Sequence, residues 1–333
     1  ALKGVSYPVC KGRILKHAKN WLQFLGRIEI PKQPRHPSQV TEFVDYMQKE
    51  RNLSERTIYN RRWELQKFFS QIKEEPGQFL SNLTPAQLDA IQIQKLKQGV
   101  YSRYTIRNRA AALRAFFRYA ERQGWCRTGI ADSIQDPRIY THEALPSSPS
   151  WEDVQRLLKT TEGNRPSNIR ARAVILLLAV YGLRDSEVRR LRLDDFDWKQ
   201  ETFRLKRSKC GPIQQFPLVQ TVGQALIRYL KEVRPQRTAY REIFLTLQAP
   251  FRPMNSLFRI VYSHWKPLNV AIKNHGTHSL RHACATRLIN QGVPLKTIAD
   301  QLGHRNLETT RIYAKVDLPR LREVANFNLR GVL

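Results

Sequence analysis

The chain has 333 residues, which is enough for two domains that each bury a hydrophobic core of their own. Its formal net charge is +29, and both halves of the chain are basic. Residues 1–150 contain 25 Lys and Arg against 13 Asp and Glu, and residues 151–333 contain 32 against 15. Four dispersed cysteines without a Cys-x-x-Cys pair argue against a zinc ribbon or a disulfide framework, and no apolar run approaches the ~20 residues that span a bilayer.

Residues 1–35 are expected to form a basic N-terminal extension. They contain no apolar segment of the kind found in secretory signals, so we expect a cytoplasmic protein. Residues 11–25 have the pattern of one basic amphipathic helix that ends before Pro31, Pro34 and Pro37. Such a helix is suited to grip a nucleic acid or to pack on a neighbouring subunit.

Residues 36–136 predict a domain of four helices. Ser54 and Ser102 are suited to cap the second and the fourth, and Thr84-Pro85 combines a cap with a proline at the first helical position. Apolar residues recur at helical spacing in each segment, which predicts one buried stripe per helix. The expected helices cover residues 41–50, 55–72, 85–96 and 103–122.

Arginines and small polar residues cluster near the starts of the second and fourth expected helices. A helix N-terminus attracts phosphate, and two basic domains are suited to hold one polyanion. A solvated charged face is the simplest alternative, but the position of both clusters favours DNA. The candidate DNA-binding residues are Arg56, Thr57, Asn60, Arg61, Arg62, Arg103, Thr105, Arg107 and Arg109.

Residues 137–149 contain three prolines and predict an interdomain linker, after which Ser150 caps the first helix of a second domain over residues 150–316. Residues 169–183 are almost all apolar and predict a buried helix. It ends in Tyr-Gly-Leu-Arg184-Asp-Ser-Glu187. An arginine beside a buried helix needs an anionic ligand or an internal carboxylate, and a purely structural salt bridge with Glu187 explains this pattern equally well.

Residues 202–205 and 213–218 predict a two-stranded hairpin around a turn that contains Lys206 and Lys209. Hairpin lysines are usually phosphate contacts. Further helices are expected over residues 221–233, 254–270, 279–291 and 294–302.

The C-terminal part concentrates ionisable groups in His278-Ser-Leu-Arg281, Leu302-Gly-His304 and Tyr313. A phenol with a pKa near 10 is a weak nucleophile at neutral pH, so it needs a base and nearby cations. A guanidinium matches two phosphate oxygens, which favours phosphoryl transfer to tyrosine. An ordinary half-buried helix tyrosine is the alternative.

A zinc site is the other interpretation of these histidines. His275, His278, His282 and Cys284 lack the usual ligand spacing, so we predict no metal site and expect His282 and Cys284 to be packing residues. A histidine after a glycine helix end, as at Gly303-His304, is often only a surface residue.

The order and spacing of these groups resemble the His-x-x-Arg, Leu-Gly-His and Tyr box of tyrosine recombinases, the family of phage integrases and Xer recombinases. Tyr313 follows Arg281 by 32 residues and His304 by nine, as in that family. The resemblance covers about residues 38–316. It implies a mainly α fold with a small β-hairpin or sheet (α+β), in which a SAM-like helical core-binding domain and a catalytic domain close on DNA as a C-shaped clamp.

The resemblance also implies a role for each matched residue. Tyr313 would attack the scissile phosphate to give a 3′-phosphotyrosyl link, with His278 as base and Lys209 as acid, although Lys206 competes with Lys209 for that role. Glu187 would support Arg184. The implied catalytic set is Arg184, Lys209, His278, Arg281, His304 and Tyr313, with no metal, no other cofactor and no ATP.

The implied partners are double-stranded DNA recombination sites and further copies of the chain. A homo-tetramer on DNA would exchange strands through a Holliday junction, whereas the free protein would be a monomer or weak dimer. Accessory DNA-bending proteins or partner recombinases are further implied partners, and no contact with a membrane is expected. Integration or excision of a mobile element at the bacterial nucleoid is the expected role. Residues 317–333 would dock as a tail in cis or in trans. A type IB topoisomerase and a catalytically silent DNA-binding protein remain alternatives.

Overall fold

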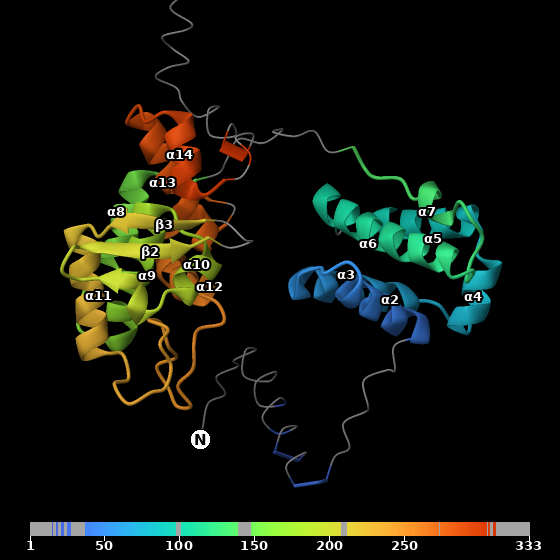
Figure 1. Cartoon of the computed structure of the whole chain (residues 1–333), viewed down its shortest axis with the longest axis horizontal. Helices are drawn as coiled ribbons and strands as arrows, with labels where there is room; N and C mark the ends of the chain where they lie inside the picture. The colour runs from blue at the N-terminus through green and yellow to red at the C-terminus, as the bar shows by residue number, and fades with distance from the viewer. Residues whose placement is uncertain are drawn as a thin grey trace, which may run out of the picture. The chain divides into compact units, whose positions relative to one another are not determined.

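The computed structural model describes residues 37–97, 101–138, 148–207, 212–272 and 274–304, together with residues 15, 18, 21, 22, 25–27, 306, 309 and 310. The chain divides into two compact units, residues 1–141 and 142–333. The elements of both units are labelled in Figure 1. Over the described residues the protein is mainly helical with one small antiparallel sheet, which confirms the predicted fold class.

Over residues 37–138, as far as they are described, helices are the only regular elements of the first unit. They are α2 (Ser38–Lys49), α3 (Glu55–Phe69), α4 (Pro76–Asn82), α5 (Pro85–Lys97), α6 (Arg103–Arg122) and α7 (Ile130–Ser133). The four expected helices correspond to α2, α3, α5 and α6. The expected number was wrong, because α4 and α7 are too short to show a helical period and α4 contains Pro76 and Gly77.

Aromatic side chains form the core of this unit. Phe68 and Phe117 are fully buried and meet edge to face, with ring centroids 5.9 Å apart, and Phe69 and Phe116 meet in the same way at 5.6 Å. Phe43 of α2 adds a third edge-to-face contact, to Phe116. These contacts join α2, α3 and α6, so the positions of α3 and α6 relative to each other are fixed by large rigid groups.

The second unit is organised around α9 (Pro166–Tyr181), which is buried along most of its length. It packs against five other helices. These neighbours are α8 (Trp151–Lys159), α10 (Asp185–Arg190), α11 (Gln220–Glu232), α12 (Phe258–Trp265) and α13 (Thr277–Asn290). The last described helix, α14 (Leu295–Leu302), packs on α13, and Figure 1 shows the two side by side.

The predicted hairpin is present and carries one further strand. The antiparallel sheet has the order β1 (Phe196–Asp197), β2 (Thr202–Lys206) and β3 (Ile213–Pro217). Phe203 pairs with both Phe196 and Phe216, and the three rings stack on one face. The Tyr181 hydroxyl at the end of α9 donates to the Pro217 carbonyl at 2.8 Å, which ties the sheet to the central helix.

One local expectation needs adjustment and another is confirmed. The segment expected as one helix over residues 254–270 is helical only in α12, followed by a 3₁₀ turn over Lys266–Leu268, because Pro267 removes a backbone donor. Ser150 does cap α8, as predicted, and forms a reciprocal capping box with Asp153. No described helix combines the length and the apolar character needed to cross a membrane.

Gly182 provides a test of how tightly the end of α9 is packed. It has φ of +63°, and a Cβ there would lie 2.5 Å from Leu302 Cδ2 and 3.2 Å from Cys284 Sγ. We expect Gly182→Ala to lower the free energy of unfolding by about 2–4 kcal/mol, from backbone strain plus overpacking. Urea unfolding of the full-length protein measures this change.

Gly292→Ala is the matched control, because Gly292 has φ of +78° but no atom within 4 Å of an added Cβ. It should cost only the backbone strain, about 1–2 kcal/mol. Equal costs for the two variants would show that the α9–α14 contact is loose.

Candidate active site and nucleic-acid interface

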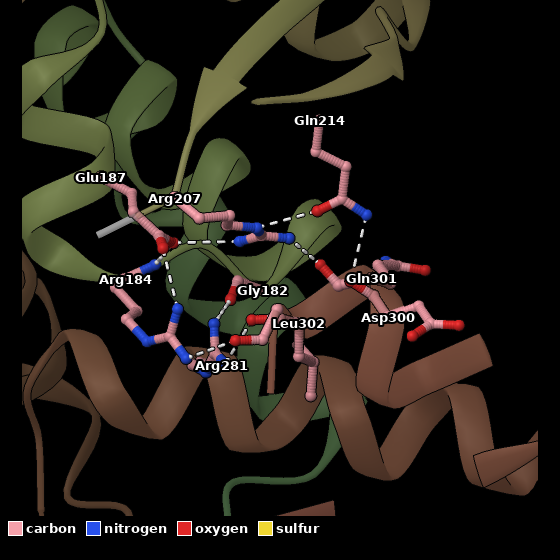
Figure 2. Close-up of polar contacts among 10 residues, drawn as sticks. Gly182, Arg184, Glu187, Arg207, Gln214, Arg281, Asp300, Gln301 and Leu302 are labelled. Carbon is pink, nitrogen blue, oxygen red and sulfur yellow. Dashed lines mark hydrogen bonds and ion pairs between the residues drawn. The ribbon is translucent and has the colours of Figure 1, made fainter. Parts of the chain in front are cut away.

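The C-terminal end of α14 is the centre of the candidate active site. A helix leaves its last carbonyls short of intrahelical donors, and α14 ends at Gly303, which has φ of +65° and donates its own N–H to the Asp300 carbonyl at 3.0 Å. Four consecutive carbonyls, from Asp300 to Gly303, accept hydrogen bonds from side chains of other elements. Figure 2 shows the first three of these residues with their donors. The donors, in the order of the carbonyls, are Gln214, Arg207, Arg281 and Arg184. Three guanidinium groups therefore gather at one helix end, where the helix dipole favours positive charge.

Arg184 lies at the start of α10, directly after the αL turn that ends α9. Its guanidinium donates to the Gly303 carbonyl at 3.0 Å and to Glu187 Oε1 at 2.8 Å. Its backbone N–H donates to Glu187 Oε2 at 2.8 Å. The predicted Arg184–Glu187 ion pair is therefore present, and the Arg184 side chain is still 28% exposed.

Arg281 lies in the first turns of α13 and joins the ends of two other helices. It donates to the Gly182 carbonyl at 2.6 Å and to the Leu302 carbonyl at 2.7 Å. Its side chain is 2% exposed, and two backbone carbonyls fix the direction of the guanidinium. Arg281 and Arg184 thus approach the end of α14 from different elements.

Glu187 carries the negative charge between two of the arginines and is 2% exposed. Burial alone would raise the pKa of its carboxyl. The hydrogen bonds from Arg184 and the charge of Arg207 outweigh burial and hold this pKa below its ordinary value. Glu187 is therefore ionised at neutral pH, as a buried carboxylate between two guanidiniums must be.

Arg207 is a member of this cluster that the sequence analysis missed. It follows β2 and is 4% exposed, with bonds to Glu187 Oε2 at 3.1 Å, to Gln214 Oε1 at 2.8 Å and to the Gln301 carbonyl. The predicted hairpin turn includes it, between Lys206 and Lys209. The alternation of buried residues along β2, at Phe203 and Leu205, continues to residue 207 and was the signal that could have found it.

Two histidines complete the described part of the site. Burial lowers the pKa of His278, and the charges of Arg281 and Arg184 lower it further. Burial also lowers the pKa of His304 to about 4, with added repulsion from Arg281 and Arg184. Both imidazoles are therefore neutral at pH 7. His304 Nδ1 is 2.7 Å from Thr310 Oγ1, a bond that orients its ring.

The other candidate metal ligands are packing residues or bond to backbone carbonyls. His275 Nε2 lies 3.0 Å from the Val270 carbonyl, and Cys284 is buried with its Sγ 3.4 Å from the Val180 carbonyl. Burial raises the pKa of the Cys284 thiol to about 12. The His282 ring packs on that of His278 at 5.3 Å, and burial lowers the pKa of His282 to about 4. Among the described residues, no group of three or more His, Cys, Asp or Glu is placed to hold a metal ion.

The structure therefore brings together Arg184, Glu187, His278, Arg281 and His304. Lys209 and Tyr313 lie outside the described residues. Lys206, the competitor of Lys209, is exposed at the end of β2.

The candidate DNA-binding residues lie on α3 and α6, whose N-termini are built alike. Ser54 caps α3 and Ser102 caps α6, each accepting from the backbone N–H three residues on, at Thr57 and Thr105. In each cap the two hydroxyls also hydrogen-bond, at 2.9 and 2.8 Å. The exposed candidates are Arg56, Asn60, Arg103, Thr105 and Arg107, and the partly buried ones are Thr57, Arg61, Arg62 and Arg109.

Two of the partly buried arginines lack a carboxylate bond among the described contacts. Arg61 lies 3.7 Å from Met47 Sδ, and burial lowers its pKa. Nε and one terminal nitrogen of Arg109 are buried without a hydrogen-bond partner, and burial lowers its pKa as well.

Exposed aromatic rings between the basic residues of α3 are a second feature that the sequence analysis missed. Tyr59 and Trp63 are each 48% exposed. Arg56 lies 5.6 Å from the centre of the Tyr59 ring, and Lys67 lies 5.2 Å from that of Trp63. The pattern of basic and aromatic side chains is typical of surfaces that contact nucleic acids.

Two family models match the chain. The model of the phage integrase family matches residues 150–319, about half of the chain, and that of the phage integrase N-terminal SAM-like domain matches residues 40–124. Among curated proteins, a putative integrase/recombinase y4rA of Sinorhizobium fredii is 35% identical over 305 residues, which cover 90% of this chain and 73% of that protein. A tyrosine recombinase XerC of Oceanobacillus iheyensis is 27% identical over 289 residues, 85% of this chain and 93% of that one.

Solved structures share the fold at low sequence identity. The XerH site-specific recombinase bound to a palindromic difH substrate aligns over 95% of this chain and 94% of its own, with a TM-score of 0.65 and 20% identity. A lambda integrase dimer bound to a COC′ core site aligns over 81% and 95%, with a TM-score of 0.64 and 16% identity. With the matching family models and the y4rA relative, these findings show that the chain belongs to the phage integrase family of tyrosine recombinases.

Proposed function

We propose that this protein is a site-specific DNA recombinase that cuts and rejoins strands through a 3′-phosphotyrosyl intermediate. The observation that carries the proposal is the convergence of Arg184, Arg281, His278 and His304 at the end of α14. Two guanidiniums and two neutral imidazoles provide donors for phosphate oxygens and a base for a phenol. No other described part of the chain gathers these groups.

The arginines act by electrostatic preorganisation. The transition state of phosphoryl transfer carries extra negative charge on its non-bridging oxygens. Arg184 and Arg281 are already held by backbone carbonyls and by Glu187, so little reorganisation is needed when that charge develops. His304 contributes as a neutral donor: in the tautomer that accepts from Thr310 at Nδ1, Nε2 carries the proton and donates to the phosphate.

The proton transfers follow from the same arrangement. Tyr313 Oη bonds to phosphorus while the bond to the 5′ oxygen breaks. Neutral His278 takes the phenol proton, and Lys209 gives a proton to the leaving 5′ oxygen. Side-chain cations take the part that Mg²⁺ has in other phosphoryl transfers, and the phosphotyrosyl bond conserves the energy for rejoining, so neither a metal ion nor ATP is required.

The substrates proposed are double-stranded DNA recombination sites. Similar structures include XerH with its difH substrate and a Tn1549 transposon integrase with a circular intermediate DNA. By analogy, four protomers would exchange strands in two rounds through a Holliday junction, with accessory or partner proteins. The similarity to putative integrases supports a role in moving a mobile element.

Replacing the proposed nucleophile tests the reaction. Tyr313→Phe removes the attacking oxygen but no cation, so we expect full loss of covalent adduct and unchanged DNA affinity. The substrate is a nicked suicide duplex carrying the recombination site, which is first identified by sequencing the DNA that the protein binds. An SDS-resistant adduct, formed without metal ion or ATP, is the measurement.

Tyr240→Phe is the control for this experiment, because Tyr240 is 42% exposed and lies in a loop after α11. It should form the adduct at the wild-type rate. An adduct that persists in Tyr313→Phe would contradict the assigned nucleophile. Tight site binding by the wild type without any adduct would leave only a DNA-binding protein.

Salt dependence tests the DNA contacts of α6. Arg107 is exposed near the start of this helix, and each phosphate contact adds about 0.9 to the slope of log Kd against log salt. We expect Arg107→Ala to weaken binding to a duplex of random sequence and to lower the slope by about 1. Lys49→Ala, which removes a cation paired with Asp45 on α2, should leave the slope unchanged. An unchanged slope for Arg107→Ala would remove Arg107 from the interface.

The pH dependence of cleavage tests the base. The base must be a neutral imidazole. Burial keeps the pKa of His278 below 6.5, so this residue becomes protonated only at a lower pH than an exposed histidine does. At DNA concentrations below Kd, we expect the cleavage rate to stay constant from about pH 8 down to about pH 6.5 and to fall only below that. A rate that halves above pH 6.5 would mean that His278 is not the titrating base.

A further inference from the structure

The burial of Arg207 needs an explanation beyond stability. It is 4% exposed, and a buried ion pair often adds no net stability, because desolvation of the two charges offsets their attraction. Burial lowers the pKa of Arg207 against the pull of Glu187, so the site holds this charge at a cost. The side chain also lies over Phe216, 5.4 Å from the ring centre, where an apolar residue would pack without a charge.

The contacts of Arg207 lead directly to Arg184. One terminal nitrogen of Arg207 donates to Glu187 Oε2 at 3.1 Å, and the same oxygen accepts from the backbone N–H of Arg184. The other oxygen of Glu187 accepts from the Arg184 guanidinium. Figure 2 shows Glu187 between the two guanidiniums. Without Arg207, Glu187 Oε2 would lose its bond to a guanidinium.

Arg207 also fixes the other support of Arg184, the end of α14. It donates to the Gln301 carbonyl, two residues before the Gly303 carbonyl that accepts from Arg184. A Cβ on Gly303 would lie 2.7 Å from Arg207 Nε. Residue 303 is therefore a glycine for two reasons, its φ of +65° and the close approach of Arg207.

We propose that Arg207 is a positioning residue for DNA cleavage, which holds Glu187 and the end of α14 so that the Arg184 guanidinium points at a non-bridging oxygen of the scissile phosphate. This inference rests on the proposed function of Arg184. It gives a role in cleavage to a residue that is buried and has no need to touch DNA. A shift of about 1 Å in a group that binds the transition state can lower a rate about 100-fold.

Arg207→Gln tests the inference on the suicide duplex. Glutamine keeps a polar group but removes the charge and the planar set of guanidinium donors. We therefore expect the cleavage rate at saturating DNA to fall about 30- to 100-fold, with DNA affinity changed less than about 3-fold. Arg207→Lys keeps the charge and should recover part of the rate. The matched control is Arg204→Gln, because Arg204 is exposed on the same strand and should cleave at the wild-type rate.

A second substrate separates positioning from general damage to the fold. A methylphosphonate at the scissile position replaces one charged non-bridging oxygen by a methyl group, so a cation aimed at that oxygen matters less. If Arg207 acts through Arg184, the defect of Arg207→Gln should shrink at least about 5-fold on this substrate. An equal defect on both substrates would overturn the inference.

A third substrate tests a different route, through the hairpin that carries Lys209. A 5′-thiol leaving group needs no proton, so a defect that disappears with a bridging sulfur, and not with the methylphosphonate, would also overturn the inference. Wild-type protein and Arg204→Gln must form the adduct on the unmodified suicide duplex. If neither does, the proposed function itself fails, which distinguishes that failure from an error about Arg207 alone.

Discussion

The candidate site depends on one physical constraint, the unsatisfied carbonyls at the C-terminal end of α14. A helix end inside a folded unit needs donors for its last carbonyls, and here side chains at the start of α10, after β2, on β3 and on α13 supply them. Because three of the donors are guanidiniums, satisfying the helix end also concentrates positive charge. The requirement of the fold and the requirement of phosphate chemistry are thus met by the same hydrogen bonds.

The carboxylate of Glu187 makes this concentration of charge tolerable. Three guanidiniums without a counter-ion would repel one another in a partly desolvated site. One carboxylate reduces that repulsion and leaves a net positive charge for a phosphate. The same positive surroundings act with burial to keep His278 and His304 neutral, so the cations and the proposed base belong to one electrostatic system.

The sequence predicted the side chains of this site better than it predicted their supports. Arg184, His278, Arg281 and His304 were found because they stand at fixed spacings in short motifs, and the predicted Arg184–Glu187 pair is present. The backbone carbonyls that hold the arginines carry no sequence signal, because every residue has one. Arg207 was missed because the first strand of the hairpin was predicted to end at residue 205, although the alternation of buried residues along β2 extends to residue 207. Lys209 and Tyr313 stay predictions from the family pattern.

The arrangement at α14 has a consequence for how the protein is made. The carbonyls that complete the cluster lie 119 residues after Arg184, 94 after Arg207 and 21 after Arg281. Synthesis runs from the N-terminus, so all three arginines are joined to the chain before their carbonyl partners are. A nascent or truncated chain can hold a basic surface against DNA but cannot complete the arginine cluster. The basic surface of α3 and α6 can thus form before the arginine cluster, which closes only when the end of α14 has been made.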